Sequence, residues 1–167
     1  MEKTELTGLS RDPRGRVLRL LLFAYVLMLL WVLFLQRAET ARHAWDDYDA
    51  AIRLNLVPFA TIDRYVRAIR AGRVVEIAYI NLVGNLVLFM PMGVLLPLCF
   101  LQFQKPWRFF LLLAALLPAM EAMQLLLRCG CCDVDDVLLN FFGAALAYAV
   151  TLPIIKSMQH RRQGRKE

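Results

Sequence analysis

Ionisable and amide side chains interrupt a long apolar segment in the C-terminal half of the chain. Glu121, Gln124 and Arg128 are spaced i, i+3 and i+7, which places their side chains on one face of a helix. An ionised group in hydrocarbon costs about 2.5–3.5 kcal/mol even on mild insertion scales. We therefore expect these residues to face a protein interior or a watery cavity, where carboxylates and an arginine could serve as acid, base and anion clamp.

The next apolar segment carries the same pattern. Asp133, Asp136 and Asn140 repeat the i, i+3, i+7 spacing on one helical face. Gly143 and Ala147 continue along that face, and such small residues allow a neighbouring helix to approach closely. The segment is therefore predicted to turn a polar face towards another helix.

A third pair of amides, Asn81 and Asn85, lies at i and i+4 near the start of an earlier apolar segment. All three groups are expected within two or three helical turns of one membrane surface. Glu121 is the deepest, roughly 10 Å from Arg128 by helix rise. Three helices thus bring polar groups to one level, which predicts a binding site. The sequence does not indicate which cofactor, if any, this site uses, and we assign no metal to it. The candidate site residues are Glu121, Gln124, Arg128, Asp136, Asn140, Asn81 and Asn85.

Each of these residues also has a structural interpretation. The amides could form only interhelical hydrogen bonds, each worth about 0.6–2 kcal/mol. Asp133 and Asp135 could cap the helix that they begin or lie at its surface, and we favour this interpretation for that pair. Glu121 and Arg128 could form a structural ion pair. Glu121 and Asp136 are the two residues that we expect to mark a functional site.

Composition places the chain in a membrane. Of its 167 residues, 59% are hydrophobic, and the mean hydropathy is +0.51, well above that of an ordinary soluble protein. The net charge is +6, but the basic residues lie in tails and loops, so they indicate topology and lipid headgroups rather than nucleic-acid binding. Three of the four cysteines fall in one turn at 129–132. This spacing gives weak support to a zinc site, and it leaves open a disulfide or a simple apolar turn.

The apolar blocks predict an all-α fold, a polytopic membrane helical bundle with four transmembrane helices. At about 1.5 Å per residue, such blocks can cross a hydrocarbon core of roughly 30 Å. Pro91 and Pro118 are expected to kink their helices. The predicted units are an N-terminal tail at 1–16, a transmembrane domain at 17–155 with spans near 17–35, 77–103, 109–127 and 134–155, and a basic tail at 156–167.

The connection between the first two spans has a helical pattern of its own. From Thr61 to Arg73, apolar residues fall on one side and arginines on another. This pattern suits a short interfacial helix in the headgroup layer, and equally a solvated surface helix. The preceding stretch, residues 55–59, is too apolar for a free loop and is expected to pack onto the bundle.

Basic residues in both tails and in the turn at 102–108 predict that both termini are cytoplasmic. The first loop, 36–76, holds seven arginines and opposes this orientation. It also holds six acidic residues, which the positive-inside rule does not count. Under this topology, the candidate site faces outward.

A series of motifs follows in a specific order and spacing from Asn55 to about Tyr148, over most of the chain. The motifs are Asn55-Leu-Val-Pro-Phe-x-Thr-Ile, Asn81-Leu-Val-Gly-Asn85, Phe89-x-Pro91-x-Gly93-x-x-Leu-Pro97, Glu121-x-x-Gln124, Arg128, and Asp133-Val-Asp-Asp136-Val-x-x-Asn140-x-x-Gly143. Their order resembles that of the VanZ-like family. The resemblance implies a small integral membrane protein of the bacterial cell envelope, located in the plasma membrane, and the family's name-giving member is linked to low-level teicoplanin resistance. The cysteine-rich turn is not a recognised family feature.

Three functions fit this sequence. The first is binding of an amphiphilic envelope molecule or lipoglycopeptide through the outward polar pocket, with the lipid bilayer as the general partner. The second is an enzyme that modifies a lipid or cell-wall precursor, with carboxylates as acid and base or as ligands of Mg²⁺. The third is a small transporter or an assembly subunit. The spans contain no recognised nucleophile motif and no histidine, which counts against the enzyme function. Whether the protein is an enzyme stays open.

Overall fold

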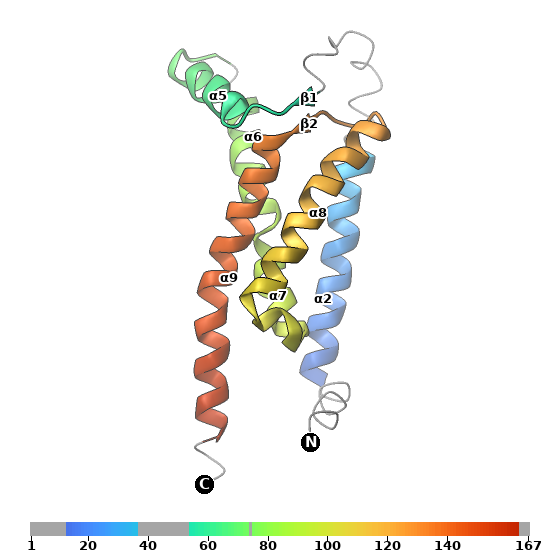
Figure 1. The fold of residues 1–167 in the computed structure, drawn as a ribbon, viewed down its shortest axis with the longest axis vertical. Coiled ribbons are helices and arrows are strands. Elements are labelled where there is room, and N and C mark those ends of the chain that lie inside the picture. Colours follow the sequence, from blue (N-terminus) through green and yellow to red (C-terminus); the bar gives the residue numbers. More distant parts are fainter. Residues whose placement is uncertain (1–12, 37–53, 74, 164–167) are drawn as a thin grey trace.

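The computed structural model describes residues 13–36, 54–73 and 75–163, and these form a bundle of long helices with a small cap at one end (Figure 1). The elements in chain order are α2 (Pro13–Leu30), the π-helix η1 (Trp31–Gln36), β1 (Leu54–Asn55), α5 (Ala60–Arg70), α6 (Val75–Leu88), α7 (Met90–Cys99), the 3-10 helix η2 (Leu101–Gln104), α8 (Pro106–Leu126), β2 (Cys132–Asp133) and α9 (Val134–Gln163).

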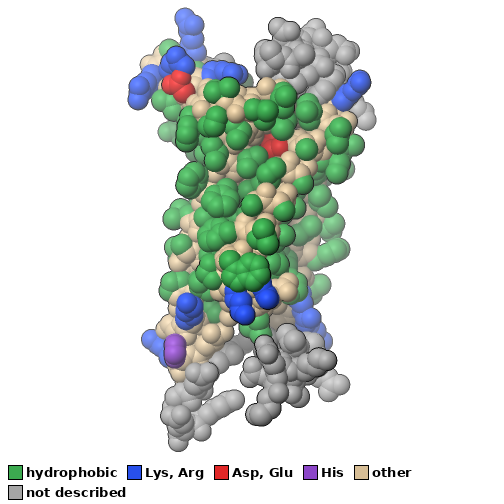
Figure 2. All heavy atoms as spheres, viewed as in Figure 1, with side chains coloured by type: hydrophobic (Ala, Val, Ile, Leu, Met, Phe, Trp, Pro, Cys, Tyr) green, Lys and Arg blue, Asp and Glu red, His purple; other side chains and the backbone are tan. Residues whose placement is uncertain are grey.

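Four helical segments of the described chain are long and apolar enough to cross a membrane, which confirms the predicted all-α polytopic bundle. Apolar side chains cover the sides of the bundle, and lysines and arginines gather at its two ends (Figure 2). Many large apolar residues point outward, as lipid contact requires. The four segments are Gly15–Gln36, Val75–Cys99, Pro106–Leu126 and Val134–Arg161.

The second span consists of two helices, because the chain breaks at Phe89 between α6 and α7. Pro91 lies in the first turn of α7, where its missing N–H is tolerated. The Met92 N–H bonds to the Phe89 carbonyl, three residues back, at 3.1 Å. The Tyr25 hydroxyl donates to the carbonyl of Leu88 at 2.9 Å. A neighbouring helix thus satisfies a carbonyl at the break, as hydrocarbon surroundings demand.

The other predicted boundaries shift by a few residues. The second span ends at Cys99, since residues 101–104 form η2, and α8 begins at Pro106. Pro118 lies inside α8, which runs without interruption. Helices also extend into both predicted tails, from Pro13 at one end and as far as Gln163 at the other. The rest of each tail lies outside the described residues.

Helix α9 is the central element, and it packs on α6, α7 and α8. Two glycines permit this contact. A Cβ on Gly143 would lie 1.7 Å from the Leu86 carbonyl oxygen of α6, and one on Gly93 would lie 2.2 Å from the Ala144 carbonyl oxygen and 3.0 Å from the Ala147 Cβ. The predicted close approach along Gly143 and Ala147 is therefore confirmed.

The apolar core lies between α2, α7, α8 and α9. Phe109 of α8 is fully buried and stacks on Tyr148 of α9, with ring centroids 4.1 Å apart and planes 9° apart. Tyr25 and Leu29 of α2 belong to the same buried cluster. This core joins the first span to the other three.

The connection between the first two spans and the connection between the last two build the cap. Strand β1 pairs in parallel with β2, with Leu54 opposite Cys132 and Asn55 opposite Asp133. Helix α5 lies across the end of the bundle (Figure 1), with exposed Arg64, Arg67 and Arg70. We call this the loop end. The start of α2 and the end of α9 lie together at the opposite, terminal end.

Candidate functional site

A hydrogen bond joins the polar faces of α6 and α9. The Asn85 side chain, which is buried, donates through Nδ2 to Oδ1 of the half-buried Asp136. The contact exists because α6 and α9 both begin at the loop end and run side by side. Two of the predicted site residues, 51 positions apart, are thus in direct contact.

Glu121 brings a carboxylate from α8 to the same end. Its side chain is 4% exposed, and Oε2 accepts the Asp133 backbone N–H at 3.3 Å. Asp133 immediately precedes α9, so Glu121 links α8 to the start of α9. A carboxylate buried at this depth costs free energy unless polar groups surround it.

Asn140 extends the polar face one turn further from the loop end. It is 3% exposed. Its Oδ1 atom has no hydrogen-bond partner within the part of the chain that the structure describes. Asp136 before it bonds to α6, and Gly143 after it lies on α6, so Asn140 faces the same side. We call Asn85, Glu121, Asp136 and Asn140 the loop-end cluster.

Gln124 has a structural partner instead. The side chain is fully buried, and Nε2 donates to the Leu33 carbonyl in η1 at 3.1 Å. Leu33 belongs to the last turn of the first span, where carbonyls lack partners within the helix. Gln124 therefore fastens α8 to the end of the first span.

Two further predicted residues lie apart from the cluster. Helix α8 ends at Leu126, and Arg128 follows with φ 56° and an exposed side chain. The helical spacing that grouped Arg128 with Glu121 does not extend to it, and the two form no ion pair. Asn81 is half-buried and donates to the Ile77 carbonyl of its own helix at 2.9 Å.

The structure adds a residue that the pattern did not single out for binding. Asp135 is fully buried. Its Oδ1 atom accepts the Phe59 N–H at 2.6 Å, and Oδ2 accepts the N–H groups of Thr61 at 2.8 Å and Ile62 at 3.0 Å. These donors begin α5, where unpaired N–H groups attract negative charge. Asp135 is a helix cap, as expected, but of a helix far away in the sequence.

Asp133 completes this clamp. Its Oδ1 atom accepts the Asp135 N–H at 2.9 Å, which caps α9, and the Asn55 Nδ2 at 3.1 Å. Its Oδ2 atom accepts the Thr61 hydroxyl at 2.6 Å. The apolar side chains of residues 55–59 were expected to pack onto the bundle, but Leu56, Val57 and Phe59 are 61–64% exposed. The stretch is held instead by the hydrogen bonds of the polar residues on either side of it. The signal in the sequence was the pair of polar residues, Asn55 and Thr61, on either side of that stretch.

The comparison with known families agrees with this architecture. The family model described as VanZ/LLP1 matches residues 22–156. The chain belongs to the VanZ-like family. No curated protein and no solved structure gives a significant match. The matched range contains every residue of the loop-end cluster and of the Asp133–Asp135 clamp, together with the glycine contacts of α9.

The cysteine-rich turn of this VanZ-like protein lies beside the cluster. None of the four cysteines forms a disulfide bond. Burial raises the pKa of the Cys132 thiol, and the negative charges of Glu121 and Asp133 raise it further. Cys132 therefore lies within the electrostatic reach of both carboxylates. No group of three or more metal-ligating side chains is placed to hold an ion within the described ranges.

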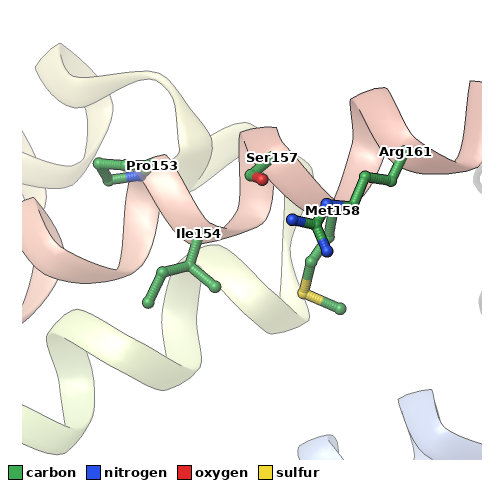
Figure 3. Close-up of a pocket in the computed structure, with 5 residues that line it drawn as sticks. All are labelled: Pro153, Ile154, Ser157, Met158 and Arg161. Atoms are coloured by element: carbon green, nitrogen blue, oxygen red, sulfur yellow. The ribbon is translucent and has the colours of Figure 1, made fainter.

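A surface depression of about 410 Å³ occurs elsewhere, near the terminal end of α9 (Figure 3). Residues of α9 alone line it, so no second helix encloses a ligand there. None of the predicted site residues takes part. The lining residues are Pro153, Ile154, Ser157, Met158 and Arg161.

Proposed function

We propose that this VanZ-like membrane protein binds an amphiphilic molecule of the bacterial cell envelope at its loop-end cluster. The observation that carries the proposal is the contact between Asn85 and Asp136 near the start of α9, together with the buried carboxylate of Glu121 that bonds to the Asp133 N–H just before α9. Three helices supply these groups within an otherwise apolar bundle. Ionisable residues inside membrane segments are costly to bury and commonly serve ligand or ion binding.

The proposed site is open to an amphiphile from the side of the bundle. Asp136 is half-buried, whereas Asn140, one turn further in, is buried. Helices α6 and α8 both pack on α9 and make little contact with each other. An acidic side chain is visible within the apolar surface a short way from the loop end (Figure 2). A polar group could enter here while its acyl chain stays in lipid.

The proposed orientation places the loop end outside the cell and both termini in the cytoplasm. Basic residues near the terminal end support it, among them Arg16 and Arg19 of α2, Lys105 before α8, and Lys156 of α9. The arginines of α5 oppose this orientation under the positive-inside rule. Because α5 lies across the bundle end and presents them outward, we assign them to binding of lipid headgroup phosphates.

Teicoplanin carries an acyl chain and a polar body, so it belongs to the proposed ligand class. The test expresses the wild-type chain and Glu121→Gln in a teicoplanin-sensitive Gram-positive host and measures the inhibitory concentration. The wild type is expected to raise it and Glu121→Gln to lose the effect. Glu76→Gln, the same change at an exposed carboxylate of α6, is the matched control.

Membrane levels and melting temperatures of the three proteins must agree for this comparison to hold. Resistance that is equal in the wild type and Glu121→Gln would contradict the proposal. A parallel mass spectrum of envelope lipids tests the enzyme alternative, since a new lipid species that depends on Glu121 would show chemistry rather than binding.

A further inference from the structure

The Asn140 Oδ1 atom is a buried acceptor that the described part of the chain leaves without a donor. Such an atom costs about 1–3 kcal/mol when nothing pairs with it. Its position is not incidental, because Asn140 lies between Asp136 and Gly143 on the face of α9 that contacts α6. A hydrogen-bond donor that reaches this face would satisfy the atom.

Two of the other members of the loop-end cluster are acidic. Asp136 lies one turn away on the same helix, and Glu121 is buried on the adjacent α8. Arg128, the cation that the sequence grouped with them, is exposed beyond the end of α8. An acceptor one helical turn from the Asp136 carboxylate favours a donor with positive charge over a neutral or anionic group.

On the premise that the loop-end cluster is the amphiphile site proposed above, we propose that it selects a polar group that is a primary ammonium. The Asn140 Oδ1 atom accepts one ammonium hydrogen as the innermost contact. Asp136 and Glu121 stabilise the positive charge. A quaternary ammonium has the same charge but no N–H, so it cannot satisfy Asn140.

The test compares two headgroups on one acyl chain length. Purified protein in detergent micelles is titrated with dihexanoyl phosphatidylethanolamine and with dihexanoyl phosphatidylcholine, and each Kd is measured calorimetrically. The ethanolamine lipid is expected to bind at least about tenfold more tightly, since a charge-assisted hydrogen bond is lost with the choline lipid. Equal affinities would overturn the inference.

Substitutions at Asn140 test whether this residue causes the difference in affinity between the two lipids. Asn140→Leu removes the acceptor and is expected to bring the two affinities together, whereas Asn140→Asp keeps an acceptor and should retain the preference. Asn81→Leu is the matched control, because Asn81 bonds only to its own helix. A preference that persists in Asn140→Leu would contradict the role of Asn140. The wild-type comparison stands even if a variant fails to fold.

Failure of this inference can be told apart from failure of the proposed function. Equal binding of both lipids that Glu121→Gln weakens would leave an amphiphile site without ammonium selectivity. Absence of binding by either lipid, together with unchanged teicoplanin susceptibility, would overturn both. Free ethanolamine distinguishes two sources of the ammonium group. Displacement of the lipid at similar concentration would indicate a soluble amine, and no displacement would assign a lipid headgroup.

Discussion

The carboxylate of Asp135 accepts the backbone N–H of Thr61 at 2.8 Å, across 74 positions of the sequence. The same side chain accepts the N–H groups of Phe59 and Ile62. A fully buried charge thus caps the first turn of α5. Phe59 has φ 66°, a strained value for a bulky residue that persists only where its surroundings impose it. The start of α9 therefore determines where α5 lies.

Asp135→Ala is expected to release α5 from the bundle. Three hydrogen bonds to a charged acceptor are lost and three donors are left without their partner, so we expect a loss of about 2–4 kcal/mol. Hydrogen exchange of the amides of residues 59–62 should increase, and the melting temperature should fall. Asp63→Ala is the control, since its exposed ion pair with Arg67 contributes roughly 0.3–0.5 kcal/mol. Unchanged exchange in Asp135→Ala would contradict the clamp.

Gly143→Ala is expected to push α9 away from α6. The new Cβ would meet the Leu86 carbonyl oxygen, a backbone atom that cannot move aside, and overpacking of this kind costs about 1–3 kcal/mol. Gly84→Ala is a matched control, because nothing lies within 4 Å of its Cβ position. It should be neutral or slightly stabilising, by up to about 1 kcal/mol. Thermal unfolding in detergent measures both, and equal melting temperatures would argue against this packing.

Two tyrosines of the core should respond differently to the loss of the hydroxyl. Tyr25→Phe removes the bond to the Leu88 carbonyl at the helix break and should destabilise by about 1–3 kcal/mol. Tyr148→Phe removes a buried hydroxyl that has no partner among the described residues, so stability should stay unchanged or rise. The two melting temperatures, compared with the wild type, decide the matter. A larger loss from Tyr148→Phe would contradict the assignment.

The Cys132 thiol should alkylate slowly at neutral pH. Its pKa is raised, so the reactive thiolate is scarce at pH 7 and increases as the pH rises through the shifted value. Glu121→Gln removes one of the negative charges that raise this pKa, and it should therefore shift the rate profile to lower pH. The measurement uses a variant in which Cys99, Cys129 and Cys131 are replaced by alanine. An identical profile with Glu121→Gln would place Glu121 too far away to act.

Much of this architecture follows from local sequence patterns. Four apolar blocks are long enough to become spanning helices whatever their neighbours are. Helical spacing placed Asp136, Asn140 and Gly143 on one face of α9, and the absence of a side chain at Gly143 indicated a close helix contact there. Pro91 marked the region where the second span breaks. These features depend only on residues within a few turns of each other.

The partners of the polar residues depended on the tertiary structure. Spacing grouped Arg128 with Glu121, but α8 ends at Leu126, and the residues beyond a helix end no longer follow its periodicity. Asp135 looked like a cap for its own helix, and it caps α5 instead. A sequence pattern fixes which face a side chain occupies. The path of the chain decides which distant donor meets that face, because a hydrogen bond needs its two atoms within about 3 Å of each other.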